Sequence, residues 1–477
     1  MIPLTPQVAA QITGGRWLRV PKDFEQPLVG AAFDSRRIGS EQIFFALNQG
    51  GVDGSRFIDQ LPPTQIELAV VQQEVPAPEG LAVLWVPDSL KALHQLARWR
   101  AEHFGGKILS LTGSSGKTTT KTWLRHCLEP HLAVQSNPGS FNNHIGCPVT
   151  VLSLKPETEL LILEMGTSGV GELELLCGIA PADVTLLLNV GHAHLGKFGS
   201  AEALLEAKLE IFKHQRLGGQ AIVPGWDQRI QGRLPSGAWT FGPGSPRFAR
   251  RLEAVGPLGQ RFELSGPSGS VQVEVPHPGD YVGDLLAAVY AVFEALELPV
   301  ETLADCCSSL PQERGRSTLV CGALGEQLLD DSYNANPESV VNMLQTLTSL
   351  KADRYIGVVG NLAEMDEGLQ QSGEVILRGL PPKLTHLFLG GQSGQDLAPA
   401  IRQARPDLEL HLFEQPLELL PLLAPLRGPG AVIGIKGSRS AHMERLTWAL
   451  SGQDAACPLP RCGLLLNCAD CPQLNAH

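Results

Sequence analysis

The chain has 477 residues and a formal net charge of −12, with 43% hydrophobic and 18% charged residues, a composition typical of a globular protein. The length predicts about three domains. The negative charge opposes nonspecific binding to phosphate backbones, so we expect no nucleic-acid partner. The sequence has neither an apolar run of roughly 18 residues, which a membrane helix needs, nor an amino-terminal export signal, so we expect no membrane insertion and a cytoplasmic location.

Residues 1–105 form the first predicted domain. Here LAVLWV (81–86) predicts a buried strand, and SLKALHQLARWRAEHF (89–104) has the apolar spacing of a helix with Ser89 as its N-cap. Gly105 and Gly106 then interrupt the pattern, which indicates a domain boundary.

The second predicted domain covers residues 106–312 and begins with the strand KILSLTG (107–113). The runs ELLILEMG (159–166) and ADVTLLLNVG (182–191) are continuously apolar, as expected for parallel strands covered on both faces. The patterns also predict helices over 200–215 and 280–298, and a hairpin formed by RFELSG (261–266) and SVQVEV (270–275).

The third predicted domain, residues 313–450, again alternates strands with helices. Its predicted strands are QLLDDSY (327–333), RYIGVVGN (354–361), HLFLGG (386–391) and GAVIGIKG (430–437). Residues 451–477 form a cysteine-rich tail without periodicity. We therefore expect an α/β protein of three domains, with a central P-loop parallel-sheet ATPase domain and a Rossmann-like C-terminal domain.

The strongest local signal is a glycine loop between a strand and a helix, in LTGSSGKTTTK (111–121). Such a loop turns backbone N–H groups toward a phosphate, and the helix N-terminus adds a favourable partial charge. Lys117 would reach the β- and γ-phosphates of ATP, and the Thr118 hydroxyl would ligate Mg²⁺. The loop is short, since Leu111 stands where the usual pattern has glycine. The alternative is an ordinary glycine turn in which the Gly-Lys-Thr sequence of the phosphate loop occurs by chance. The predicted ATP-binding residues of this loop are Gly113, Ser114, Ser115, Gly116, Lys117, Thr118 and Thr119.

Two further side chains are predicted to lie at the same sheet edge. Glu164 follows the strand ELLILE, and His194 follows the strand VTLLLNV. A carboxylate and an imidazole at this edge suit a second divalent ion near the γ-phosphate. His192 is the rival for His194, and either histidine can instead be a solvated loop residue. Lys208, taken alone, is typical of a solvated helix face.

Several motifs in this order resemble the Mur ligase family of ATP-dependent amide ligases of peptidoglycan synthesis. They are the glycine loop, ILEMGTS (162–168), NVGHAHLGKFGS (189–200) and AKLEIF (207–212). SNPGSFNNHIGCPVTVL (136–152), LLDDSYNANPESV (328–340) and IKGSRSAHMERL (435–446) are similar to the branch that joins D-alanyl-D-alanine to UDP-N-acetylmuramoyl-tripeptide. FDSRRIGSEQIFFAL (33–47) and GGVDGSRFI (50–58) resemble its uridine-nucleotide domain.

The resemblance implies roles at the matching positions. Glu164, His194 and Lys208 would be metal ligands with Thr118, and Lys208 matches a lysine that is carbamylated in several members. Lys117, Lys208, His194 and Arg316 would be the catalytic residues. Asp331 would bind the ribose, with Asn334 and Asn336 on the adenine side. The substrate side would involve Ser35, Arg36, Asn142, Asn143 and Lys436. ATP and Mg²⁺ would be required, and we expect a monomer.

Three places depart from the family pattern. PGDYVGDLLAA (278–288) has Asp280, Tyr281 and Asp284 where the family has a Gly-x-His-Asn-x-x-Asn run, which puts adenine recognition in question. Gly360-Asn361-Leu362 replaces Gly-Asp-Met, and Ser55 replaces a histidine. None of these touches the phosphate loop or the expected metal ligands.

The expected reaction is attack of the tripeptide carboxylate on the γ-phosphorus, followed by attack of the D-alanyl-D-alanine amine on the acyl phosphate. Alternatives are a Mur ligase that adds the third residue, a folate or cyanophycin-type ligase, and, from another class, a P-loop kinase or a nucleotide-binding regulator. A ligase releases ADP only when both the carboxylate and the amine partner are present.

The tail carries Cys457, Cys462, Cys468 and Cys471, spaced C-x₄-C-x₅-C-x₂-C. Four thiolates can bind zinc, and thiolates also bind iron–sulfur clusters. The flanking prolines and the short x₅ segment instead favour a loose, reduced extension with no metal, and this is our expectation from the sequence.

Overall fold

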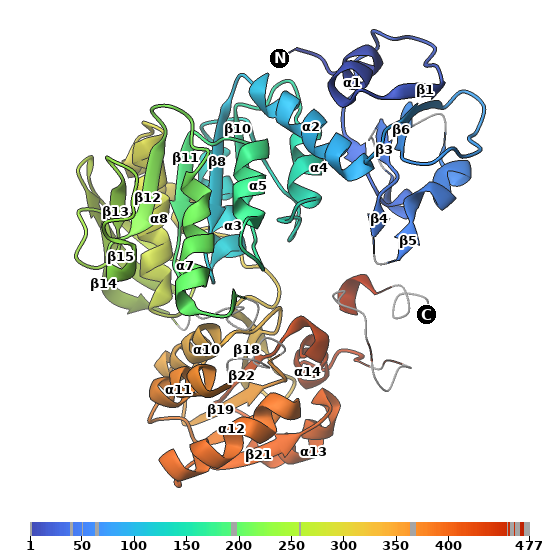
Figure 1. Ribbon diagram of the computed structural model, residues 1–477. Coiled ribbons are helices and arrows are strands. Elements are labelled where there is room, and N and C mark those ends of the chain that lie inside the picture. Colours follow the sequence, from blue (N-terminus) through green and yellow to red (C-terminus); the bar gives the residue numbers. More distant parts are fainter. Residues whose placement is uncertain are drawn as a thin grey trace.

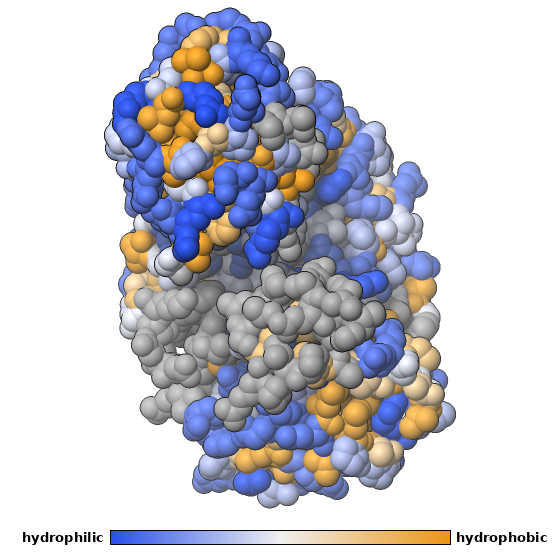
Figure 2. Space-filling model, turned by 90° about the vertical axis from the view of Figure 1, so that its right-hand side faces the viewer, coloured by the Kyte–Doolittle hydropathy of each residue, from blue (hydrophilic) through white to orange (hydrophobic). Residues whose placement is uncertain are grey.

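The computed structural model describes residues 2–38, 42–49, 51–62, 66–191, 198–256, 259–362, 369–455, 457, 462 and 468–471. The chain forms an amino-terminal part beside a central part, with a C-terminal part below them (Figure 1). On the face that carries the amino-terminal part, hydrophobic residues gather in patches separated by hydrophilic ones (Figure 2). Among the described helices, none is long and apolar enough to cross a membrane.

The amino-terminal part is built on a five-stranded sheet of order β1-β7-β6-β3-β2. The strands are β1 (Arg16–Arg19), β2 (Ala31–Ala32), β3 (Ile43–Phe45), β6 (Leu68–Val71) and β7 (Ala82–Trp85). All neighbours pair in parallel except β1, which is antiparallel to β7. Helix α1 (Pro6–Thr13) precedes the sheet, and β4 (Asn48–Gln49) and β5 (Val52–Asp53) form a separate two-stranded ribbon.

Helix α2 (Ser89–Glu102) links the amino-terminal and central parts. Its buried hydrophobic residues belong to one continuous core cluster that includes residues of both the amino-terminal sheet and the central strand β10 (Leu160–Glu164). The N-cap is Asp88, whose side chain accepts from Lys91 N, so the prediction of Ser89 was wrong by one residue. Ser89 is fully buried and donates its hydroxyl to Ala46 O over 2.7 Å.

The central sheet has six strands in the order β13-β12-β11-β8-β10-β9. They are β8 (Lys107–Thr112), β9 (Val134–Ser136), β10 (Leu160–Glu164), β11 (Val184–Leu187), β12 (Gln220–Pro224) and β13 (Trp239–Phe241). All neighbours are parallel, which confirms the prediction made from the apolar runs. Both faces are covered, since Leu109 and Ile162 pack in one core cluster while Ile108 and Leu161 pack in another.

The helices of the central part are α3 (Lys117–Leu128), α4 (Gly146–Leu152), α5 (Glu172–Ile179), α7 (Ala201–Leu209), α8 (Tyr281–Ala295) and α9 (Leu303–Cys307). The predicted helix 200–215 is shorter than expected, because it ends in a 3₁₀ turn over Glu210–Phe212. The predicted hairpin is present as β15 (Gly259–Gly266) and β16 (Gly269–Val275), but a third antiparallel strand, β14 (Phe248–Val255), completes it.

The C-terminal part has a six-stranded sheet of order β17-β18-β22-β19-β20-β21. The strands are β17 (Thr318–Cys321), β18 (Gln327–Asp331), β19 (Arg354–Val359), β20 (His386–Gly390), β21 (Glu409–Phe413) and β22 (Ala431–Lys436). Only β17 is antiparallel to its neighbour. The helices are α10 (Pro337–Ser349), α11 (Leu369–Gly379), α12 (Gly391–Ala404), α13 (Leu419–Leu423) and α14 (Glu444–Leu450).

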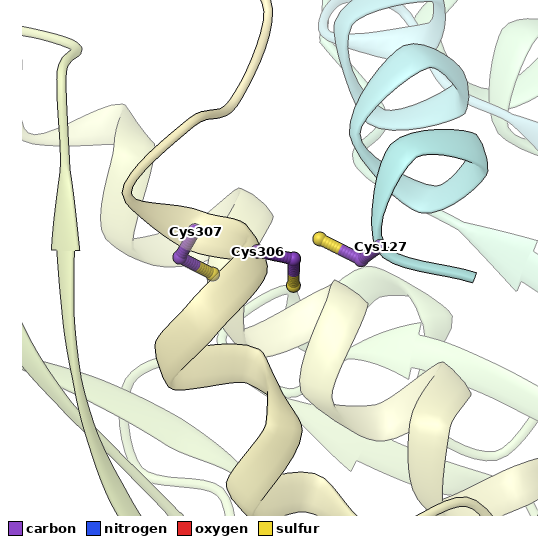
Figure 3. A group of neighbouring side chains, drawn as sticks. All are labelled: Cys127, Cys306 and Cys307. Atoms are coloured by element: carbon purple, nitrogen blue, oxygen red, sulfur yellow. The ribbon is translucent and has the colours of Figure 1, made fainter. Parts of the chain in front are cut away.

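Three cysteines that are scattered in the sequence meet in the central core. Cys127 comes from the last turn of α3, and Cys306 and Cys307 from α9 (Figure 3). Their sulfur atoms all lie within 4.8 Å of one another. Contact with the Cys306 thiol, together with burial, raises the pKa of the Cys127 thiol, and Cys307 is likewise held protonated by its neighbours. Cys127 and Cys307 pack in the core as small hydrophobic groups, whereas their contacts lower the pKa of the partly buried Cys306 thiol.

Candidate active site

The glycine loop joins β8 to α3 as the sequence predicts. Gly116 has φ 78°, a left-handed conformation that favours glycine, and Lys117 begins the helix. A Cβ at Gly113 would lie 2.9 Å from Leu188 Cβ, which is too close for a larger residue. Both glycines are therefore required by the local backbone and by the neighbouring strand end.

The loop is held in place by Asn189, which follows β11. The amide groups of Ser114 and Ser115 both donate to Asn189 Oδ1 over 3.0 Å. Ser114 Oγ in turn accepts from Gly191 N over 2.9 Å. Sequence reasoning missed Asn189, although it stands at the end of the predicted strand 182–191.

Two lysines converge on the same carbonyl of the loop. Lys117 Nζ donates to Gly113 O over 2.6 Å, and Lys208 Nζ, from α7, donates to it over 3.3 Å. Lys208 is only 2% exposed, so it is not the solvated residue that its helix pattern alone indicates. Two positive charges thus lie beside a loop whose geometry suits a polyanion.

Glu164 is the last residue of β10 and is almost fully buried. Its Oε1 accepts from Thr118 Oγ1 over 3.2 Å and from Asn142 Nδ2 over 2.8 Å. Burial acts to raise the pKa of this carboxyl, but the charges of Lys121 and Lys117 outweigh it, and the pKa lies below its usual value. The carboxylate is therefore ionised and adjoins the Thr118 hydroxyl, an arrangement of hard oxygen ligands that fits Mg²⁺.

Lys121 is the second residue that sequence reasoning missed. Its Nζ lies 3.2 Å from Glu164 Oε2 and donates to Asn137 O and Gly139 O over 3.0 and 2.6 Å. It stands four residues after Lys117 on α3, one helical turn further from the loop. This spacing of four residues from Lys117 is the feature of the sequence that could have identified Lys121.

The C-terminal part contacts the loop through Arg316 and Asn336, and it contacts α3 through Glu313. Arg316 donates to Thr118 Oγ1 over 3.1 Å, and its guanidinium stacks 4.2 Å from the centre of the Tyr333 ring. Asn336 Nδ2 lies 3.5 Å from Ser114 O, and its Oδ1 caps α10 by accepting from Ser339 N. Thr122 of α3 also contacts Glu313. The loop thus lies at the seam between the central and C-terminal parts.

Asp331 and Lys436 form an ion pair on the C-terminal side of this seam, and both side chains are largely buried. They occupy paired positions of the parallel strands β18 and β22, and Lys436 Nζ contacts Asp331 Oδ2 and Asn334 O over 2.5 and 2.9 Å. Burial lowers the pKa of Lys436, while the Asp331 charge acts to raise it. The pair orders the segment that carries Asn334 and Asn336.

The residues expected on the substrate side are dispersed. Ser35 and Arg36 lie in a 3₁₀ turn of the amino-terminal part, and Arg36 pairs with Asp34. The Phe33 ring lies 6.1 Å from the Phe141 ring, which joins this part to the 141–143 turn. Asn142 faces Glu164, whereas Asn143 accepts from Ile145 N and Gly146 N at the start of α4.

Two predicted positions remain to be placed. Thr119 lies in the first turn of α3. His194 and its rival His192 lie outside the described residues.

One of the three departures from the family pattern, at Asp280, Tyr281 and Asp284, lies at the start of α8. Burial raises the pKa of Tyr281 to about 12, and the Asp331 charge also acts to raise it. Burial, and then the charge of Asp280, raise the pKa of Asp284 to about 6. This helix end is therefore partly desolvated and close to Asp331.

The comparisons with known proteins agree with this geometry. The Mur ligase middle domain matches residues 111–292, and the Mur ligase, glutamate ligase domain matches residues 315–439. The UDP-N-acetylmuramoyl-tripeptide–D-alanyl-D-alanine ligase of Bacillus subtilis is 29% identical over 89% of this chain and 93% of its own length. The ligase of the same name from Escherichia coli is 31% identical over 87% of this chain and 92% of its own length.

Solved structures of similar proteins share the whole architecture. Crystal structure I of MurF from Acinetobacter baumannii has 29% identity and a TM-score of 0.85, covering 95% of this chain and all of its own. MurF ligase from Thermotoga maritima, solved in complex with ADP, has 26% identity and a TM-score of 0.79, covering 89% of this chain and 98% of its own. The chain therefore belongs to the Mur ligase family of ATP-dependent amide ligases.

Proposed function

We propose that this enzyme joins D-alanyl-D-alanine to UDP-N-acetylmuramoyl-tripeptide through an acyl phosphate, in peptidoglycan precursor synthesis. The observation that carries the proposal is the convergence of Lys117, Lys208 and Arg316 on a phosphate loop at the seam between two parts of the chain. Relatives that bear the name of this reaction align with 87–89% of the chain.

The loop residues 113–119 would bind ATP, with Lys117 at the transferred phosphate. Arg316 already donates a hydrogen bond to the Thr118 hydroxyl and would add positive charge beside the phosphate. The tripeptide carboxylate attacks the γ-phosphorus and ADP leaves; the amine then attacks the acyl carbon and phosphate leaves. Positive charge is required because both reactants of the first step are anionic.

Thr118 and Glu164 would hold Mg²⁺, which neutralises phosphate charge when bound. We propose His194 and a carbamylated Lys208 as further ligands; carbamylation would turn this lysine, now in contact with the loop carbonyl, into an anionic oxygen ligand. Lys121, which now balances the Glu164 charge, would keep that carboxylate ionised.

Each successive part of the chain would bind a different part of the substrates. Residues 1–105, with Ser35 and Arg36, would hold the uridine side of the substrate, and Asn142 and Asn143 would lie along its muramoyl part. Residues 106–312 would bind ATP. Residues 313–450 would supply Asp331, Asn334 and Asn336 to the nucleotide and Lys436 to the cleft. The seam they form would exclude water from the acyl phosphate. We propose a cytoplasmic monomer.

The test is ADP release by the full chain. We expect release from ATP and Mg²⁺ only when UDP-N-acetylmuramoyl-tripeptide and D-alanyl-D-alanine are both present, with formation of the pentapeptide product by mass. Release that needs no amine would indicate a kinase. Release supported by UDP-N-acetylmuramoyl-dipeptide with a diamino acid would indicate the third-residue-adding reaction.

A further inference from the structure

Residues 468–471 of the tail pack on the C-terminal part rather than extending into solvent. Cys468 and Cys471 are each only 6% exposed. Cys468 N donates to Glu444 Oε1 of α14 over 3.0 Å, and Cys471 N donates to Cys468 O over 3.2 Å, closing a turn. Arg445 Nε also donates to Ala455 O over 3.1 Å. The expectation of a loose extension is therefore wrong for these residues.

The turn brings the Cys468 thiol, a soft metal ligand, to an imidazole. Cys468 Sγ lies 3.3 Å from His442 Nδ1. These two atoms and a Glu444 carboxylate oxygen all lie within 4.8 Å of one another, and all three residues are buried. Cys462 lines the same cavity as His442. The Cys468 thiol thus contacts a histidine of the folded C-terminal part, and Cys462 lies at the same cavity.

Two guanidinium groups lie beside the cluster, since Arg439 pairs with Glu444 and Arg445 donates to Ala455 O. In the metal-free protein, burial raises the pKa of the Cys468 thiol above its usual value, although the charges of Arg439 and Arg445 act to lower it. The two guanidinium groups offset part of the negative charge that several thiolates would gather there.

We propose that Cys462, Cys468, Cys471 and His442 bind a thiophilic divalent cation of the Zn²⁺ class. Three sulfurs and one imidazole nitrogen form a common tetrahedral set for structural zinc, and C-x₂-C is a common half-site. Each thiol would release its proton to solvent as the metal binds, with no change in oxidation state. Glu444 would act as a positioning residue, since its carboxylate already pairs with Arg439 and accepts from Cys468 N.

The site would connect the tail to the ligase cleft. Arg439, the partner of Glu444, lies 5.8 Å from the centre of the Tyr333 ring, on which Arg316 also stacks. A metal that fixes His442 and Cys468 would therefore steady the segment that holds Arg439. Metal binding itself does not depend on the proposed ligase reaction, so the two can fail separately.

The experiment measures zinc and iron in the full chain, purified in reductant without chelators. We expect zinc equimolar with the chain, and loss of it in both Cys468→Ser and Cys471→Ser. Cys457→Ser, in the tail, and Cys127→Ser, in the buried thiol cluster of the central core, are the matched controls and should keep the metal. Circular dichroism establishes that each variant is folded.

A second measurement needs no variant. The zinc-free wild-type chain is titrated with Co²⁺, and we expect the intense thiolate-to-cobalt charge-transfer absorption of a site with several sulfur ligands, abolished by Zn²⁺. A chain that binds neither ion would overturn the proposal. So would zinc that survives in Cys468→Ser and Cys471→Ser but is lost in Cys127→Ser. Iron with acid-labile sulfide in place of zinc would indicate an iron–sulfur cluster and would also overturn it.

Discussion

Lys121 Nζ lies 3.2 Å from Glu164 Oε2, and the two side chains are 5% and 1% exposed. Removing one partner of such a buried pair leaves an uncompensated charge, which costs about 3–5 kcal/mol. We therefore expect Lys121→Ala to lower the free energy of unfolding by that order, measured by urea denaturation. Lys155→Ala, at an exposed position, is the control. A Lys121→Ala variant as stable as this control would contradict the conclusion that Lys121 compensates the buried charge of Glu164.

Lys117→Ala should abolish ligase turnover while leaving the fold intact. The Lys117 ammonium group is a point charge at the loop, and removing such a clamp lowers the rate by about 10²–10³-fold or more. Steady-state ADP release with both substrates checks this, and a thermal melt checks folding. Lys213→Ala removes an exposed lysine that pairs with Glu174 and should keep full activity. A folded Lys117→Ala enzyme with most of its activity would refute the role.

Lys208→Ala should lose about 10–100-fold in activity and recover part of it in buffer containing a short carboxylic acid such as formate. The reason is that a free carboxylate can replace the oxygen ligand that a carbamylated lysine would supply. Lys117→Ala serves as the control, because its missing group is a cation and formate cannot replace it. Equal recovery of both variants, or none for Lys208→Ala, would argue against carbamylation.

Asp284→Asn should stabilise the protein at neutral and higher pH. Burial holds the folded-state pKa of Asp284 at about 6, against 3.8 for an ordinary aspartate, so the ionised folded state is disfavoured. Below about pH 4 the carboxyl is protonated in both states and the substitution should have no effect. Between about pH 4 and pH 6 the unfolded chain loses its proton first and the cost develops; above about pH 6 it is complete, at up to about 3 kcal/mol.

The measurement for Asp284→Asn is the free energy of unfolding at about pH 4 and about pH 8. Asp59→Asn changes an exposed carboxylate and should show no such difference. A gain from Asp284→Asn that is equal at both pH values would mean that packing, rather than titration, is responsible.

The sequence predicted the parts of the site that are contiguous in the chain. One strand, loop and helix contain the apolar run, Gly113, Gly116 and the Lys117-Thr118 pair. Their spacing in the sequence was therefore enough to predict where they lie. Lys121 and Asn189 were missed because their roles depend on where β10 and β11 end beside the loop. That placement is set by sheet order, which short-range patterns do not encode.

The errors in the fold have similar causes. β21 was missed because most of ELHLF is only partly buried or exposed, so the apolar pattern is weak. The tail was expected to be loose because its contacts with His442 and Glu444 come from residues already assigned to another domain. Local composition could not indicate that a distant surface would bury Cys468.

The contact between Asn189 and the loop has a consequence for ligand affinity. Because Asn189 Oδ1 already accepts from the amides of Ser114 and Ser115, the backbone is ordered before any nucleotide arrives. The entropic cost of fixing these residues is then met during folding, and less of the binding free energy is lost to it. A nucleotide must instead displace or accommodate one carboxamide. The affinity for nucleotide should therefore depend on the enthalpy of replacing this contact. In the free enzyme, the backbone amides of Ser114 and Ser115 should already show slow hydrogen exchange.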